Sequence, residues 1–394
     1  MRLKIVNSCC RANALRVKSV ILDDGVGNLA TPANQFGVEF VSKGTRMDRR
    51  NALRSLAAFT AGGLVSSSGS QRANAAQYTP AWKTSIDRGL NWLANDQSPR
   101  GRWVSSQRTY PTAMTALSGT ALLGSGSTTT QGPYAKHIRL AIDYLMTKVR
   151  KNGLIGDPQT DNRYTYGHGF AMLFLSQVLG EEEDKERREE LTAVLQKAVE
   201  FSGRAQTKSG GWGYMSAKEG NNFDEGSTTI TQVQGLRGCR NAGIPVSKEV
   251  IDKARQYIYM CKNPDGGISY SSKNRGASRP AITAASLASL YNAGDYDSKH
   301  VPQMMAYCKK NLYRLESARS FGHWHYTYLY YAQVVYREGG DSWKAFREKL
   351  YDRIVNKQTD EGGWFNKSYG NSYATAINLT ILQLDKGILP IYQR

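Results

Sequence analysis

The feature that most constrains the fold of this chain is a short loop pattern that recurs along it. The pattern reads Gln, three residues, Gly, one residue, Trp, and its full copies are Gln97–Trp103, Gln206–Trp212 and Gln358–Trp364. Weaker copies are Lys262–Ile268, the segment around Gly153, and Phe321–Trp324. Self-similarity at intervals of about 50 residues is typical of a fold assembled from one repeated supersecondary unit.

Each loop lies between two segments of different helical character. Upstream of the first loop, Ile86, Leu90 and Leu93 follow the helical period, and the other upstream segments carry the same single apolar stripe. Segments that are small or apolar on most faces lie downstream, for example Ala113–Leu123, Ala281–Leu290 and Ala374–Leu384. A helix that is apolar all round needs cover on every side. The pattern therefore predicts polar outer helices around buried inner helices.

A threonine recurs one turn into these inner helices, with a glycine in its place in the second repeat. The positions are Thr115, Gly169, Thr231, Thr283, Thr327 and Thr375. Six units of outer helix, Gly-rich loop and inner helix predict an all-α fold, the α/α toroid, in which six helical hairpins form an inner and an outer ring. An open α-solenoid is the alternative, but solenoids lack loops of this length.

The loop residues themselves suit a structural role. Paired glycines provide backbone conformations that other residues adopt only at a cost. A tryptophan buries its large apolar indole ring against helix ends. Its N–H and the glutamine amide can form hydrogen bonds with backbone groups that the helix ends leave unpaired. We interpret six residues as structural: Gln97, Trp103, Gln206, Trp212, Gln358 and Trp364.

The formal net charge of +19 divides into +7 for residues 1–76 (11 basic, 4 acidic) and +12 for the remainder (41 basic, 29 acidic). A basic surface can attract nucleic acid, anionic lipid or acidic polysaccharide. Here the charges are scattered and of mixed sign, which favours a solvated exterior and no nucleic-acid partner. No apolar run reaches the roughly 18 residues of a membrane span, so we expect no transmembrane helix in the mature chain.

The first 76 residues are expected to act in targeting rather than in folding. Residues 47–76 have a charged start, an apolar run and the small-x-small sequence Ala73–Ala75, and Arg49 with Arg50 resembles a twin-arginine export signal. An amphipathic surface helix is the alternative. Residues 1–46 form either an unstructured extension or a mis-assigned start. We therefore expect an exported protein, cleaved near Ala75, with a single toroid domain at 77–394.

The repeated loop on a six-fold hairpin pattern resembles that of squalene and hopene cyclases. These belong to the terpenoid cyclase and protein prenyltransferase superfamily of α/α toroids, and the resemblance covers about residues 80–390. It implies a central cavity, often lined by aromatic residues, that holds an isoprenoid or similar apolar chain. The catalytic Asp-x-Asp-Asp run of the cyclases is absent, as are the Asp-x-Cys zinc ligands of the prenyltransferases and the Cys-Gly-Glu-Gln loop of complement-type proteins. We therefore expect no metal and no cofactor.

Polar and aromatic residues gather where loops meet inner helices, which a toroid brings to one mouth of its cavity. The candidate catalytic residues are Asp224, Glu225, His168 and His325. The candidate ligand-binding residues are Tyr164, Tyr166, His323, Tyr326, Tyr328, Tyr369, Asn371 and Tyr373. Repeats two and five face one another in a ring of six, so His168 and His325 could approach across it and form, with an acid, an acid–base set or a metal site. Capping, stacking and cavity lining are the alternative roles.

Three functional hypotheses follow. The first is an exported protein that binds an apolar, isoprenoid-like or extended ligand in the ring without the standard cyclase or zinc chemistry. The second is an enzyme on the same fold, either a divergent terpene cyclase or a carbohydrate-active enzyme that pairs Asp224 or Glu225 with Asp157 or Asp161. The third is a scaffold whose rim docks a protein partner that the sequence does not identify.

Overall fold

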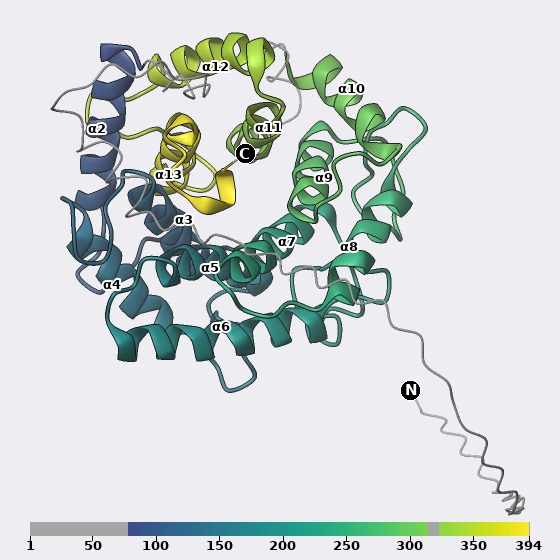
Figure 1. Cartoon of the computed structure of the whole chain (residues 1–394), viewed down its shortest axis with the longest axis horizontal. Coiled ribbons are helices and arrows are strands. Elements are labelled where there is room, and N and C mark those ends of the chain that lie inside the picture. Colours follow the sequence, from purple (N-terminus) through teal and green to yellow (C-terminus); the bar gives the residue numbers. More distant parts are fainter. Residues whose placement is uncertain (1–77, 314–322, 394) are drawn as a thin grey trace, which may run out of the picture. The chain divides into compact units, whose positions relative to one another are not determined.

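Two concentric layers of helices build the part of the chain that the structure describes (Figure 1). The computed structural model describes residues 78–313 and 323–393, and within them it contains twelve α-helices and two short 3-10 helices. The outer helices are α2 Pro80–Asn95, α4 Ala135–Met146, α6 Lys185–Ala205, α8 Lys248–Cys261, α10 His300–Leu312 and α12 Gly340–Val355. The inner helices are α3 Pro111–Leu123, α5 Tyr164–Leu179, α7 Gly226–Asn241, α9 Pro280–Asn292, α11 Trp324–Glu338 and α13 Asn371–Leu382.

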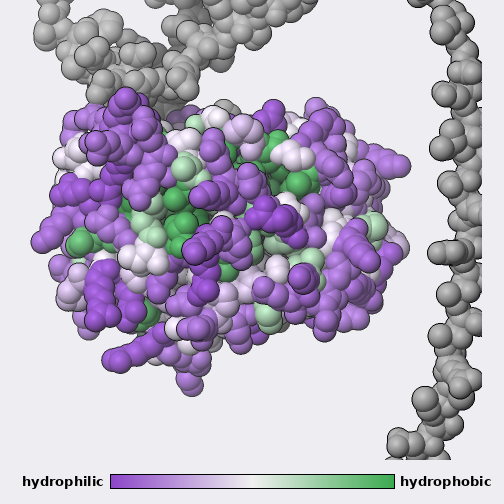
Figure 2. All heavy atoms as spheres, turned by 90° about the horizontal axis from the view of Figure 1, so that it is seen from below, coloured by the Kyte–Doolittle hydropathy of each residue, from purple (hydrophilic) through white to green (hydrophobic). Residues whose placement is uncertain are grey.

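The two layers differ in burial as the sequence pattern predicts. Every residue of α3 is buried, whereas α8 buries only Ala254, Tyr257, Ile258 and Cys261. An inner helix has other helices on all sides, and an outer helix needs only one apolar stripe against them. The outer surface is correspondingly hydrophilic over most of the side seen in Figure 2, with hydrophobic residues between the polar ones.

The helices close into a ring rather than an open solenoid. Each inner helix packs against the next, and α13 returns to pack against α3, while α12 and α13 both contact α2. Figure 1 shows the inner helices surrounded by the outer ones. The predicted all-α, six-hairpin toroid is therefore confirmed.

The repeated loops are held by the same hydrogen bonds in each full copy. The indole N–H of Trp103, Trp212 and Trp364 donates to a carbonyl near the end of the preceding outer helix, at 2.8 to 2.9 Å. The glutamine amide donates to the glycine carbonyl of its own loop and to a carbonyl of the next outer helix. In the last copy that second acceptor is the Ser85 carbonyl of α2, 2.8 Å from Gln358 Nε2. This contact joins the last repeat to the first.

The recurring threonine has a defined partner, and two of its predicted positions were wrong. The hydroxyl of Thr115, Thr229, Thr283 or Thr375 accepts the backbone N–H at the end of the loop motif, at 2.9 to 3.1 Å. In the third repeat this residue is Thr229, not Thr231: Thr229 is the fourth residue of α7, as Thr283 is of α9, whereas Thr231 is the sixth. In the second repeat it is His168, not Gly169, and His168 Nδ1 accepts from the Ile155 N–H at 3.0 Å.

The C-terminal segment covers one end of the inner ring. The 3-10 helix η3 Pro390–Tyr392 packs against α7, and its Ile391 and Tyr392 are buried. The Ile391 N–H donates to Gln177 Oε1 at 3.2 Å, and its carbonyl accepts from Arg337 at 3.1 Å. Because Gln177 and Arg337 lie near the C-terminal ends of α5 and α11, this segment covers the C-terminal end of the inner ring (Figure 1).

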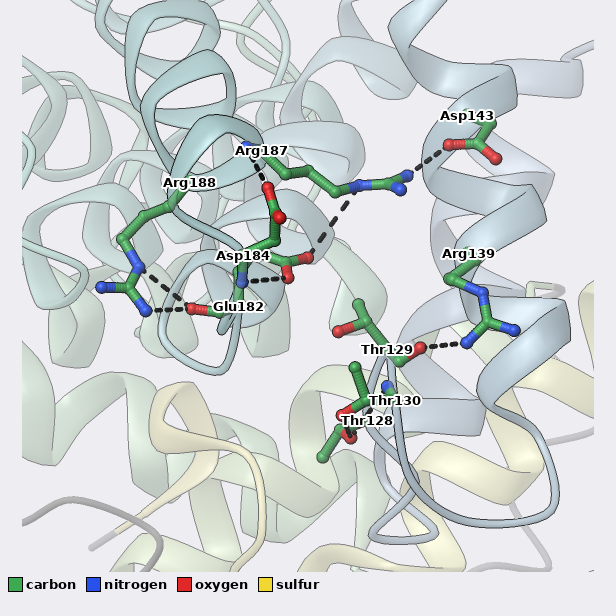
Figure 3. Close-up of polar contacts among 9 residues, drawn as sticks. All are labelled: Thr128, Thr129, Thr130, Arg139, Asp143, Glu182, Asp184, Arg187 and Arg188. Atoms are coloured by element: carbon green, nitrogen blue, oxygen red, sulfur yellow. Dashed lines mark hydrogen bonds and ion pairs between the residues drawn. The ribbon is translucent and has the colours of Figure 1, made fainter.

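Polar contacts also join neighbouring outer elements (Figure 3). Arg187 of α6 pairs with Asp143 of α4, and its Nε lies 3.9 Å from Glu182 Oε2. Asp184 caps α6 by accepting the Arg187 N–H at 2.8 Å. Asp143 and Asp184 are exposed and Glu182 is buried, so these contacts join the outer helices at the edge of the packed interior.

Several expectations concern residues outside the described ranges. The export signal, the cleavage near Ala75 and the interpretation of residues 1–46 all lie there, as do the first two residues of the weak loop copy Phe321–Trp324. No helix among the described residues is both long and apolar enough to cross a membrane. Three described cysteines, Cys239, Cys261 and Cys308, are buried and unpaired.

Candidate functional site

A cavity of about 560 Å³ lies inside the ring and is lined by residues of all six repeats. Its lining comes from the first half of each inner helix and from the loop before it, so it opens at the end opposite the C-terminal segment. Seven tyrosines contribute: Tyr110, Tyr166, Tyr214, Tyr270, Tyr326, Tyr369 and Tyr373. Aliphatic and aromatic side chains such as Met114, Phe170, Leu329 and Ile377 complete much of the wall. None of the described residues that line it is an aspartate or a glutamate.

The predicted ligand-binding residues divide into two groups. Five of them line the cavity: Tyr166, His323, Tyr326, Tyr369 and Tyr373. The other three lie elsewhere. Tyr164 accepts the Ser216 N–H and bonds Glu219, Tyr328 donates to the Leu312 carbonyl at 3.0 Å, and Asn371 is exposed at the start of α13.

Glu225 lies directly behind the cavity wall and caps α7. Its carboxylate accepts the N–H groups of Ser227 and Thr228 at 2.9 and 2.6 Å, and it also accepts both of their hydroxyls. Burial raises the pKa of this carboxyl group, and the hydrogen bonds from Ser227 and Thr228 oppose that effect. A carboxylate that accepts so many donors is suited to hold its neighbours in place.

Two cavity-lining tyrosines are linked to Glu225, Tyr166 directly and Tyr326 through Ser227. The Tyr166 hydroxyl lies 3.3 Å from Glu225 Oε1 and also bonds the Ser227 hydroxyl. From the other side of the cavity, the Tyr326 hydroxyl donates to the Ser227 carbonyl at 3.2 Å. The capping carboxylate thereby orders a polar spot in an otherwise aromatic wall.

The remaining candidate acids lie outside the cavity lining. Asp224 is buried, and its carboxylate accepts from the Ser271 hydroxyl and from the N–H and hydroxyl of Ser272 at 2.8 to 3.0 Å. Asp157 pairs with Lys148 and Arg150 at the surface. Burial raises the pKa of Asp161 to about 6, and its Oδ1 accepts the Arg163 backbone N–H at 3.0 Å.

The two candidate histidines do not meet across the ring. His168 lies between α5 and α6, where its Nε2 is 3.2 Å from the Ala198 carbonyl and its ring contacts Phe201 edge-on. His325 contacts Asn366 and Tyr373 on the side of α13. Burial lowers the pKa of each histidine to about 4. Among the described residues, no group of three or more His, Cys, Asp or Glu side chains is placed to hold a metal ion.

Four aromatic and basic residues lie in a row at the mouth of the cavity: Arg163, Tyr214, Tyr270 and Arg279. We call this row the Arg163–Arg279 arc. The Arg163 guanidinium lies 4.3 Å from the centre of the Tyr214 ring, and the Arg279 guanidinium lies 4.7 Å from that of Tyr270. The hydroxyls of Tyr214 and Tyr270 are hydrogen-bonded to each other. The arc therefore joins repeats two, three and four.

Sequence reasoning missed this arc, although two signals were present. Arg163 and Arg279 each stand directly before an inner helix. Tyr214 and Tyr270 each stand two residues after the end of the loop motif. Equal spacing from the motif places both tyrosines on the same side of their loops, because successive side chains of an extended segment alternate in direction.

Comparisons with known proteins place the fold. No protein-family model matches the sequence, and no curated protein matches it. The type II terpene cyclase MstE from Scytonema is 15% identical over 79% of this chain and 100% of its own, with a TM-score of 0.53. A variant of that cyclase in complex with geranylgeranyl dihydroxybenzoate, its substrate, is 14% identical over 79% of this chain and 98% of its own, with a TM-score of 0.53.

A second kind of protein shares the same ring. An inactive variant of the α-1,6-mannanase GH76A of Salegentibacter sp. HEL1_6, in complex with α-1,6-mannotriose, is 8% identical over 78% of this chain and 99% of its own, with a TM-score of 0.54. At these identities the likeness concerns the fold alone. The chain is thus similar to terpenoid-cyclase-like α/α toroids, which confirms the resemblance at the level of the fold.

Proposed function

We propose that this protein binds an apolar, isoprenoid-like organic molecule in its central cavity. The observation that carries the proposal is the cavity itself, about 560 Å³ in volume, with tyrosine and aliphatic lining from all six repeats. Ligand sites of proteins are concave, mostly apolar and about 300 to 1,000 Å³ in volume, with a few placed polar groups. The Tyr166–Ser227–Tyr326 contacts provide such polar groups here.

The structural neighbours bind two different classes of molecule, and the lining favours one of them. The MstE complex contains geranylgeranyl dihydroxybenzoate, and the mannanase complex contains α-1,6-mannotriose. A carbohydrate site needs many hydrogen-bonding side chains, and glycoside hydrolysis needs two carboxyl groups about 5 to 10 Å apart. Because the described lining has no carboxylate, a largely apolar ligand is the better match.

Binding of farnesol, a neutral isoprenoid alcohol, tests this proposal. Ala281 lines the cavity, so Ala281→Trp should fill part of it and weaken farnesol binding about tenfold or more, measured by isothermal titration calorimetry and native mass spectrometry. Ala277→Trp, at an exposed site in the preceding loop, is the matched control and should bind as the wild type does. Equal binding by both variants, or no binding by the wild type, would contradict the proposal.

Catalysis on the same ligand is a second candidate function, as a divergent terpene cyclase. The observation that favours it is Glu225, a buried carboxyl group whose pKa burial raises and which contacts the cavity-lining Tyr166. Incubation of the protein with polyprenyl substrates, followed by mass spectrometry of the products, tests it. Turnover that Glu225→Gln abolishes without unfolding the protein would establish this function.

Export of the protein and docking of a partner on its rim stay predictions. Residues 47–76 with Arg49 and Arg50 support export through a twin-arginine pathway. N-terminal sequencing of the protein from its host, with and without Arg49→Lys and Arg50→Lys, would show whether cleavage occurs near Ala75. Pull-down from the exported fraction tests the scaffold alternative, and recovery of the protein alone would count against it.

A further inference from the structure

The rim of the cavity carries two positive charges that the proposed apolar ligand does not explain. Arg163 stands at the start of α5 and Arg279 at the start of α9, and both line the cavity. Both are also exposed, so solvent or a ligand at the mouth can reach them. Apart from the histidine His323, they are the two basic residues among the described residues that line the cavity.

The contacts of these arginines leave their hydrogen-bonding edges available. Each guanidinium lies against a tyrosine ring, 4.3 Å from the Tyr214 centre and 4.7 Å from the Tyr270 centre. Within the described residues, no hydrogen bond or ion pair joins either guanidinium to another side chain or carbonyl. A guanidinium that stacks through its face keeps its N–H groups in a plane, where they can form paired bonds to a carboxylate or a phosphate.

The surroundings do not neutralise this charge at the mouth. No aspartate or glutamate is among the described residues that line the cavity. The nearby Glu225 carboxylate already accepts hydrogen bonds from Ser227 and Thr228. The buried Asp161 accepts the Arg163 backbone N–H and interacts electrostatically with the Arg163 side chain, but it forms no ion pair with that side chain among the described residues and does not line the cavity. All six inner helices also present their N-terminal ends toward this mouth, and the positive end of a helix dipole favours an anion.

We propose that Arg163 and Arg279 bind the anionic group of an amphipathic ligand whose apolar part occupies the cavity. The inference rests on the proposed function and narrows its ligand class to an isoprenoid-like molecule that ends in a carboxylate or a phosphate. The Tyr214–Tyr270 pair holds the two arginines at the ends of one arc. The stacked rings thereby restrict the side chains before the ligand arrives, which reduces the entropy lost on binding.

Three probes with the same isoprenoid hydrocarbon part and different terminal groups test the inference: farnesol, farnesoic acid and farnesyl phosphate. The wild type should bind at least one of the two anions about tenfold more tightly than the alcohol, because hydrogen bonds to charged groups are strong. Added KCl should weaken binding of that anion and leave binding of farnesol nearly unchanged. The anion that binds more tightly identifies the headgroup as a carboxylate or a phosphate.

Variants assign the effect to the arc. Arg163→Gln and Arg279→Gln should each weaken anion binding about tenfold and leave farnesol binding within about twofold of the wild type. Arg275→Gln is the matched control, since Arg275 lies four residues before Arg279, is exposed and donates to the Lys262 carbonyl away from the cavity. Circular dichroism melting establishes that each variant is folded, and the KCl titration of the wild type needs no variant.

The possible results separate the two proposals. Equal affinity of the wild type for all three probes, or anion affinity unchanged in both arginine variants, would overturn the arc as an anion site while farnesol binding still supports the cavity. Absence of binding by every probe would overturn the proposed function itself. Anion preference that Arg163→Gln and Arg279→Gln remove, and Arg275→Gln keeps, supports the inference.

Discussion

At the scale of single residues, Glu225 combines a capping role with a position beside the cavity. Glu225→Gln should lower the free energy of unfolding by about 1 to 3 kcal/mol, because an amide offers one oxygen where the carboxylate accepts from Ser227 and Thr228 with two. Urea unfolding followed by circular dichroism measures this loss. Glu190→Gln, on the exposed face of α6, is the control and should change little. Unchanged stability of Glu225→Gln would contradict the capping role.

His168 gives the protein a stability that depends on pH. Burial lowers its pKa to about 4, below the ordinary value of 6.5, so the folded protein keeps this ring neutral. The unfolded chain binds the extra proton between pH 6.5 and about 4, so stability is full above pH 6.5 and falls as the pH drops through this window. The contribution of His168 amounts to about 3 kcal/mol at most.

His168→Gln separates this titration from the other charges of the protein. Glutamine can still accept the Ile155 N–H but cannot take up a proton. We expect the wild type to lose more unfolding free energy than His168→Gln between pH 7 and pH 4.5, measured by urea unfolding at both values. Equal losses would show that His168 is not the group responsible, although His325, with its pKa also near 4, contributes to both proteins.

The residue scale also shows where prediction from sequence stopped. The periodic threonine was visible as a pattern, but its hydrogen-bond partner was not. His168 performs the same task as Thr115 with a chemically different acceptor, so a search for identical residues passed over it. The buried polar residues Asp224, Glu225 and His168 were predicted as catalytic from their residue types, and the sequence could not show that backbone N–H groups and side-chain hydroxyls of the fold bind them.

At the scale of elements, α5 and α7 approach closely through glycines. A β-carbon at Gly169 would lie 2.6 Å from the backbone of Thr231, and one at Gly235 would lie 2.7 Å from the Gly169 carbonyl. Neither backbone can move without shifting a whole helix. The glycine in the predicted threonine ladder thus serves helix packing, and the sequence pattern could not distinguish that from a missing threonine.

Gly169→Ala should destabilise the protein although alanine is the better helix former. Helix propensity favours alanine by about 1 kcal/mol, but overpacking against Thr231 should cost about 1 to 3 kcal/mol beyond that gain. Gly203→Ala in α6 is the control, because its β-carbon would meet Val250 at an ordinary 3.5 Å. That variant should be neutral or stabilising. Thermal unfolding of both measures the contrast, and destabilisation of similar size in the two variants would refute the close-packing account.

At the scale of the whole molecule, the repeat pattern predicted the ring of helices but not all the residues that line its cavity. Six hairpins and their order follow from periodicity, because each apolar inner helix requires neighbours on both sides. The cavity lining depends on which side chains of six separate helices meet at one mouth. Tyr166, Tyr326 and Tyr373 were predicted as ligand-binding because they lie near the starts of inner helices. Arg163 and Arg279 form a pair at the mouth only in the folded ring, which brings repeats two and four to the same cavity.

Closure of the ring gives the last repeat a partner that a linear array of hairpins would lack. Gln358 Nε2 donates to the Ser85 carbonyl of α2 at 2.8 Å, while Gln206 Nε2 makes the equivalent bond to Val250 of α8 at 2.9 Å. Each amide also bonds the glycine of its own loop. Loss of either glutamine should therefore cost a similar free energy, about 1 to 3 kcal/mol, with local effects in different places.

Hydrogen–deuterium exchange distinguishes a closed ring from an open array. Gln358→Ala should speed exchange in α2, more than 250 residues away in sequence and joined to it by this contact. Gln206→Ala should speed exchange in α8 and leave α2 as in the wild type. In an open array the last loop would have no neighbour, and α2 would not respond to Gln358→Ala. Unchanged exchange in α2 would therefore contradict closure through this loop.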